Sequence, residues 1–277
     1  MNQQTLKKAY FFEGKGLHTG TYAHMKLLPA PADAGIRFCR ADLPDQPVIE
    51  ALAENVTKTA RSTTIANGAA EAVTIEHIMS ALTGLGVDNA LIELDNQEVP
   101  ILDGSARLYA QAILQDGLED QGVPRKYIDI PLSLEVRDQR SGSWVKIEPS
   151  PAPSAEITVD FNSPVLGIQS AYWDEGTDYA REIGVCRTFC FYREIEPMLK
   201  GGLIKGGDLS NALVVTDDGY MDNPVLHFQD ECGRHKLLDL LGDFRLAGGY
   251  LNARITAYKP GHTINTKAAK AIRALLQ

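Results

Sequence analysis

The two halves of this 277-residue chain carry the same order of predicted elements. In each half a helix that ends in glycine is followed by a β-rich segment, a turn and a second helix. These elements cover residues 75–86, 90–95 and 105–117 in the first half, and residues 234–248, 253–259 and 264–277 in the second. Such a repeat predicts two similar α+β domains, each with helices layered on a β-sheet.

A stretch without periodicity separates the two halves. Residues 116–127, DGLEDQGVPRKY, combine glycine, proline and charged side chains with no helix or strand pattern. We therefore predict a first domain over residues 1–124 and a second over residues 125–277. If the two domains pack face to face, the histidines near the start of the first helix in each half, His77 and His235, can converge.

Composition excludes several classes of protein. Hydrophobic residues make up 44% of the chain, which is ordinary for a globular fold and argues against disorder. The formal net charge is −9, so nucleic acid is a poor partner, although a small anionic substrate needs only a local basic pocket. No secretory signal or membrane-spanning stretch is evident. The four cysteines form no CxxC pair, which favours reduced thiols and a cytoplasmic protein.

His235 begins the sequence HKLLDLLGD, in which Asp239 and Asp243 follow at steps of four residues. Because a helix turns about 100° per residue, these three side chains drift only about 80° around one face. An imidazole and a carboxylate one turn apart can hold a metal ion. By itself the spacing is more typical of an exposed polar stripe on an amphipathic helix.

Glu76 and His77 stand at the start of an otherwise apolar helix. One can ligate a metal while its neighbour faces a water molecule, and two histidines with one carboxylate leave a coordination position open, as in hydrolytic zinc sites. No HExxH motif is present, so that class of metalloprotease is excluded. The alternative is equally open: Glu76 favours the helix dipole and His77 is a half-buried structural residue.

The other candidates are weaker. His262 lies in a Pro-Gly turn with Lys259 nearby, either over a site or on the surface. His18 lies in the glycine-rich segment GKGLHTG, which a tight hairpin also explains. Cys232 is three residues from His235 and is a minor candidate as a metal ligand.

Five motifs in order carry a family resemblance. They are GKGLHTG, the run from TIEHIMSALTGLG to PILDGSA, CRTFCFYREIE, HKLLDLLGD and AYKPGHTIN. Together they resemble the UDP-3-O-acyl-N-acetylglucosamine deacetylase family, from about Thr5 to about Lys270. That family catalyses the committed step of lipid A synthesis in bacteria with an outer membrane.

The resemblance implies two α+β domains with the active site between them. It assigns zinc, with ferrous iron as an alternative, to His77, His235 and Asp239. It makes Glu76 the general base, His262 the acid for the leaving amine and Asp243 the carboxylate that orients His262. Lys236 becomes a supporting cation and Thr188 a hydroxyl that holds the oxyanion.

The resemblance also implies the substrate contacts. An insert near residues 189–208 lines a hydrophobic passage for the acyl chain, with Phe189, Ile195 and Ile204 among its residues. Asp160, Phe161 and Lys259 match positions that contact the nucleotide. The implied reaction removes the N-acetyl group from a UDP-sugar with a 3-O-acyl chain. We expect a cytoplasmic monomer with no nucleic-acid partner and no integral membrane segment.

Three positions depart from the family pattern. Cys190 stands where glycine is usual, Ser163 where histidine often occurs, and Asp208 where a small serine is common. They bear on acyl-chain length and nucleotide contacts. Two other functions stay open: a zinc amidohydrolase for another acetylated sugar, and a non-catalytic sugar-nucleotide or lipid-binding protein. The apolar insert argues against the first, and the presence of both Glu76 and His262 argues against the second.

Overall fold

The two halves contain sheets with the same strand order in the computed structural model, which describes residues 1–200 and 205–276. The first sheet runs in the order β2 (Tyr10–Lys15), β3 (Tyr22–Pro29), β9 (Ala90–Leu94), β4 (Ile36–Arg40), β5 (Val48–Glu50). The second runs β12 (Leu134–Arg137), β13 (Trp144–Pro149), β18 (Tyr250–Tyr258), β14 (Ser154–Asp160), β15 (Ile168–Asp174), and β11 (Tyr127–Asp129) also pairs with β18. In each sheet the last strand in sequence lies at the centre, antiparallel to one neighbour and parallel to the other.

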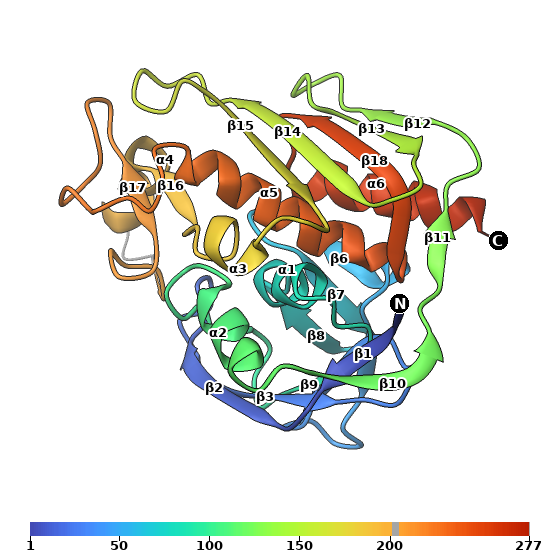
Figure 1. The fold of residues 1–277 in the computed structure, drawn as a ribbon. Coiled ribbons are helices and arrows are strands. Elements are labelled where there is room, and N and C mark those ends of the chain that lie inside the picture. Colours follow the sequence, from blue (N-terminus) through green and yellow to red (C-terminus); the bar gives the residue numbers. More distant parts are fainter. Residues whose placement is uncertain (201–204, 277) are drawn as a thin grey trace.

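Each central strand lies between two helices in sequence. They are α1 (Glu76–Gly84) and α2 (Arg107–Asp116) around β9, and α5 (Glu231–Phe244) and α6 (His262–Leu275) around β18. Figure 1 shows α1, α5 and α6 in the layer between the two sheets. One hydrophobic core therefore extends through both halves, and it includes Ile78 and Leu82 of α1 together with Leu237 and Leu241 of α5. A smaller cluster, which includes Leu213 and Val215, lies at the insert.

Helices α1 and α5 approach each other at Gly242. A Cβ atom at this position would lie 2.1 Å from the carbonyl oxygen of Glu76. No side chain fits in that space, so glycine is what permits the first turn of α1 to rest on α5. The crossing places the start of α1, where Glu76 and His77 lie, beside the helix that carries His235.

The remaining elements are short. They are β1 (Asn2–Leu6), β6 (Val56–Lys58), β7 (Thr64–Asn67), β8 (Ala70–Val73), β10 (Leu118–Pro124), β16 (Phe189–Phe191), β17 (Leu213–Val215), α3 (Tyr179–Glu182), α4 (Tyr192–Lys200), and the 3₁₀ helices η1 (Ala53–Asn55) and η2 (Arg245–Ala247). Strands β16 and β17 pair in parallel and, with α4, form an insert of the second half at one end of the molecule (Figure 1).

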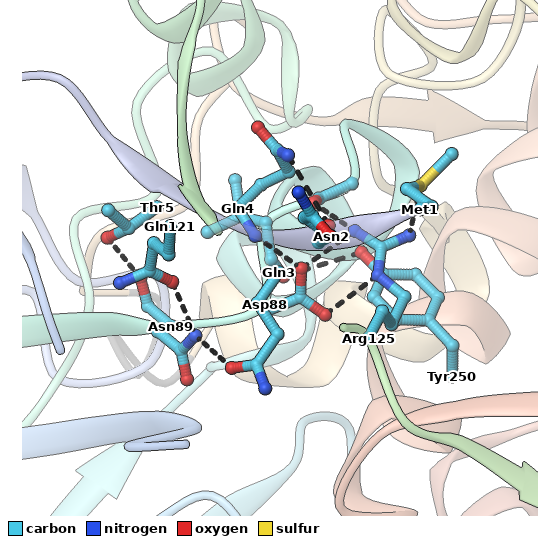
Figure 2. Close-up of polar contacts among 12 residues, drawn as sticks. Met1, Asn2, Gln3, Gln4, Thr5, Asp88, Asn89, Gln121, Arg125 and Tyr250 are labelled. Atoms are coloured by element: carbon cyan, nitrogen blue, oxygen red, sulfur yellow. Dashed lines mark hydrogen bonds and ion pairs between the residues drawn. The ribbon is translucent and has the colours of Figure 1, made fainter. Parts of the chain in front are cut away.

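Arg125 ties the two halves together where the chain passes from β10 to β11. Its guanidinium makes two hydrogen bonds to the carboxylate of Asp88, at 2.9 and 2.7 Å, and lies 4.1 Å from the centre of the Tyr250 ring (Figure 2). The Tyr250 hydroxyl donates to the carbonyl of Thr83 at 3.1 Å, near the end of α1. One buried cation thus binds the first half through an ion pair and the second half through an aromatic face.

The α+β class with two similar domains is confirmed, and three local predictions change. Helix α5 begins at Glu231 rather than beside His235, and α6 begins at His262, which was expected in a turn. The stretch expected to lack structure contains β10, which pairs with β1. Alternating burial is weak along β10, so the pairing is a long-range contact without a local signal. The boundary near residue 124 stays a prediction.

None of the helices in the described parts of the chain has the length and apolar character needed to cross a membrane.

Candidate metal centre and catalytic site

His77, His235 and Asp239 come together from the two halves. His77 is the second residue of α1, while His235 and Asp239 lie one turn apart on α5. One ligand atom from each lies within 4.8 Å of the others, and all three side chains are buried. The Oδ1 atom of Asp239 lies 3.4 Å from Nε2 of His235 and 3.8 Å from Nε2 of His77.

The surroundings of these side chains suit a divalent cation. Among the described residues, Oδ1 of Asp239 has no hydrogen-bond partner, although it is fully buried. Its other oxygen, Oδ2, accepts a hydrogen bond of 2.7 Å from Lys236. Nδ1 of His235 lies 3.0 Å from the carbonyl oxygen of Cys186, so this nitrogen carries the proton and Nε2 keeps a free lone pair. The unpartnered oxygen and the free lone pair therefore point at the same space.

The protonation states also match what a metal ion requires. Burial and the neighbouring His235 lower the pKa of His77 to about 3. Burial likewise lowers the pKa of His235. Burial raises the pKa of Asp239, but Lys236 and the surrounding histidines outweigh it and hold that pKa well below its usual range. Neutral imidazoles and an ionised carboxylate are the forms that bind a divalent ion.

Glu76 lies beside this group with one oxygen anchored. Its Oε2 accepts a hydrogen bond of 3.0 Å from the backbone N–H of Thr63. Its Oε1 lies 3.7 Å from Nε2 of His262. Burial raises the pKa of Glu76 to about 7, against the opposing effect of His262. A cation at the neighbouring ligand group would favour the ionised form of this carboxyl.

His262 is held by Asp243. Asp243 is fully buried, and its Oδ2 lies 2.9 Å from Nδ1 of His262 and accepts a hydrogen bond of 3.0 Å from Asn265 Nδ2. Its Oδ1 accepts one of 2.6 Å from Thr63 Oγ1. Burial disfavours the imidazolium, but Asp243 and Glu76 outweigh it and raise the pKa of His262 to about 9. His262 is therefore charged at neutral pH and can donate a proton from Nε2.

Thr63 and Asn265 were not among the residues predicted to belong to the site. Thr63 serves both carboxylates, through its N–H to Glu76 and its hydroxyl to Asp243. It lies in an ordinary Ser-Thr-Thr run, and nothing in the local sequence marks it. Asn265 is one turn after His262 on α6, a spacing that becomes visible only once the helix is known to begin at His262.

A cavity of about 370 Å³ opens beside these residues. Its polar lining includes Glu76, His77, Thr188, His235, Lys236, Asp239 and His262, together with His18. Its apolar lining includes Phe189, Cys190, Ile195, Leu209, Val214 and Met221. Polar catalytic groups and an apolar wall from the insert thus face one space.

The residues expected to touch substrate divide into two groups. Thr188, Phe189 and Ile195 line the cavity, and the Phe189 ring lies 6.3 Å from the His235 ring. Asp160, Phe161 and Lys259 do not belong to the described lining. Asp160 and Lys259 form an ion pair of 3.4 Å, and Phe161 packs edge-on against Phe189. Ile204 lies outside the described residues, and the nucleotide contacts stay a prediction. Cys232 is buried near the hydroxyl of Tyr220, away from the ligand group.

Comparison with protein families identifies the chain. The model of the UDP-3-O-acyl N-acetylglycosamine deacetylase family matches residues 3–274. The chain belongs to this family. Its members depend on a metal ion, and the group formed by His77, His235 and Asp239 can bind one.

Individual relatives agree with this match. The chain is 40% identical over 279 residues to the UDP-3-O-acyl-N-acetylglucosamine deacetylase of Trichormus variabilis, which covers 99% of both proteins. It is 43% identical over 295 residues to the bifunctional enzyme LpxC/FabZ of Porphyromonas gingivalis, and 39% identical over 297 residues to that of Bacteroides thetaiotaomicron. The chain spans 64% of the length of each of these two bifunctional relatives.

The first prediction concerns the metal. His235→Ala removes one of three ligands, so after dialysis the variant should retain much less zinc than the parent, which should hold one ion per chain. Cys232→Ala is the matched control, because Cys232 is buried on the same helix but lies outside the ligand group. Metal content by mass spectrometry, with thermal melting to verify folding, decides the question. Full occupancy in His235→Ala, or loss in Cys232→Ala, would contradict the assignment.

Proposed function

We propose that this protein hydrolyses the N-acetyl group of UDP-3-O-acyl-N-acetylglucosamine, releasing acetate and the free amine. One observation carries the proposal. A candidate base, Glu76, and a candidate acid, His262, lie 3.7 Å apart beside a buried metal-ligand group in a cavity with an apolar wall. Family membership and the names of the relatives supply the substrate.

Zinc is the metal we propose for His77, His235 and Asp239. Two imidazoles and a carboxylate form a common zinc ligand set, and ferrous iron uses the same set, so iron is the alternative. Such an ion, when bound, polarises the amide carbonyl and lowers the pKa of a water molecule to about 7. Lys236, at 2.7 Å from Asp239, keeps the carboxylate ionised and in place.

Glu76 acts as the general base in this proposal. The Thr63 N–H fixes one carboxylate oxygen, which leaves Oε1 directed toward the reacting groups. As water attacks the acetyl carbon, Glu76 accepts its proton. Thr188 and the charged groups Lys236 and His262 line the same cavity and stabilise the negative charge that develops on the carbonyl oxygen.

His262 acts as the general acid. Asp243 holds the imidazolium through Nδ1, so Nε2 presents its proton to the cavity. An amine is a poor leaving group until it is protonated, and transfer of this proton to the sugar nitrogen allows the carbon–nitrogen bond to break. Acetate and the amino sugar are the products.

The apolar wall of the cavity supports the choice of substrate. Phe189, Ile195 and Val214 offer a surface that suits a fatty-acyl chain, while a small soluble sugar would gain little from it. We assign the reaction to the committed step of lipid A biosynthesis in the cytoplasm. The monomeric state stays a prediction.

The second prediction tests Glu76. In Glu76→Gln the amide cannot accept the proton of the attacking water, so the rate should fall by about 10²- to 10⁴-fold while the metal is retained. Glu93→Gln is the matched control: it replaces a carboxylate on the first sheet that pairs with Lys26, and it should leave the rate unchanged. Acetate release and metal content are measured on the same samples. A variant that loses its metal, or one that keeps full activity per bound metal, would remove Glu76 from the role of base.

The third prediction tests Asp243 through pH. Burial lowers the pKa of His262, but Asp243, together with Glu76, outweighs it and raises that pKa to about 9, so His262 stays protonated until the pH passes that value. Asp243→Asn removes the negative charge, which lowers the pKa of His262 and moves the alkaline limb of the rate profile to lower pH. The rate should also fall, with metal retained. An unchanged limb in kcat against pH would show that His262 is not the acid whose deprotonation ends activity.

A further inference from the structure

A turn of the first half holds Thr188, the residue that directly precedes β16 of the second half. The turn covers residues 101–105, within the motif PILDGSA that the reaction steps leave unexplained. The carbonyl oxygen of Gly104 accepts a hydrogen bond of 2.7 Å from the backbone N–H of Thr188. The carbonyl of Thr188 in turn accepts one of 2.8 Å from Leu213. The backbone of Thr188 is thus fixed on both sides.

Only glycine fits at position 104. Its φ angle is +80°, a conformation that side chains rarely adopt. A Cβ atom there would lie 1.8 Å from the carbonyl oxygen of Asn211 and 3.3 Å from Cγ2 of Thr188. The obstacle is backbone at Asn211, so a larger residue has to displace Asn211, and with it the neighbouring Thr188, away from the first half.

The turn itself is rigid. Oδ1 of Asp103 accepts hydrogen bonds from the N–H of Ser105 at 3.2 Å and from its hydroxyl at 2.8 Å. Oδ2 of Asp103 accepts one of 2.9 Å from Nε of Arg107, the first residue of α2. The N–H of Gly104 donates to Ile101 at 2.9 Å. These hydrogen bonds connect the turn to α2, so the position of Thr188 is coupled to the position of α2.

We propose that Gly104 is a positioning residue that sets the place of the Thr188 hydroxyl over the reacting carbonyl. The inference rests on the proposed function, in which Thr188 stabilises the oxyanion. Thr188 belongs to the second half, at the start of the insert, while Glu76 and His77 belong to the first half, so the two sets need a fixed connection across the cavity. Gly104 supplies it through one hydrogen bond and a contact that excludes a side chain.

The test is a double-mutant cycle. A misplacement of about 1 Å can cost about 10²-fold in rate, so Gly104→Ala should lower kcat on that scale and leave KM nearly unchanged. In a Thr188→Ala background the hydroxyl is already gone, so adding Gly104→Ala should lower kcat much less. Gly68→Ala is the matched control, since Gly68 also has a positive φ, +59°, but nothing lies within 4 Å of its added Cβ. Gly68→Ala should leave kcat unchanged in both backgrounds.

Two further measurements test the role of Gly104 independently of the double-mutant cycle. Ser105→Ala loosens the turn without inserting an atom at Gly104, and it should lower kcat less than Gly104→Ala, again only when Thr188 is present. Amide hydrogen exchange measures the hydrogen bond between the Thr188 N–H and the Gly104 carbonyl, and it does not depend on catalysis. Gly104→Ala should speed exchange at the Thr188 amide and leave the amides of α5 protected.

Each other outcome counts against the inference. Equal losses of kcat in both backgrounds would mean that Gly104 is merely structural. Unchanged exchange at Thr188 would mean that Gly104 does not hold it. A parent protein that releases no acetate would instead refute the proposed function, and the exchange measurement would still report on the contact.

Discussion

The close crossing of α1 and α5 is the constraint on which the rest of the structure depends. Gly242 lets the backbone of Glu76 rest on α5, and a single added Cβ atom would meet that backbone at 2.1 Å. Because the two helices come from different copies of a repeated unit, their contact is what joins Glu76 and His77 to His235 and Asp239. Neither half has a complete ligand set by itself, so the proposed chemistry is a property of the pair.

That contact buries an unusual density of charge. Three buried carboxylates, Glu76, Asp239 and Asp243, share one region with the buried cation His262 and the half-buried cation Lys236. Burying such groups is costly unless each is paired or hydrogen-bonded. Each of the three carboxylates accepts a hydrogen bond on at least one oxygen, while Oδ1 of Asp239 has no hydrogen-bond partner among the described residues. The three carboxylates, when ionised, exceed the two cations by one negative charge. A divalent cation at the remaining oxygen of Asp239 would compensate that charge.

Sequence patterns predicted helices and the order of elements. They did not predict contacts between residues that lie far apart in the chain. Periodic apolar residues located α1, a helical run that ends in glycine located α2, and the order of elements predicted the duplicated domains. The ligand set came from family resemblance, because the spacing of His235 and Asp239 is by itself more typical of an exposed polar stripe on a helix. Thr63, Asn265 and the Gly104 contact had no local signal: each depends on a partner far away in the chain or on a helix start that no capping residue announces.

The central claim is that a metal held between the two halves drives deacetylation of an acylated UDP-sugar. Acetate release from UDP-3-O-acyl-N-acetylglucosamine and from UDP-N-acetylglucosamine, before and after treatment with a chelator and again after zinc is restored, tests it most directly. We predict rapid release from the acylated substrate, loss of that release with the chelator, recovery with zinc, and little release from the substrate without an acyl chain. Undiminished release from metal-free protein, or equal release from both substrates, would contradict the claim.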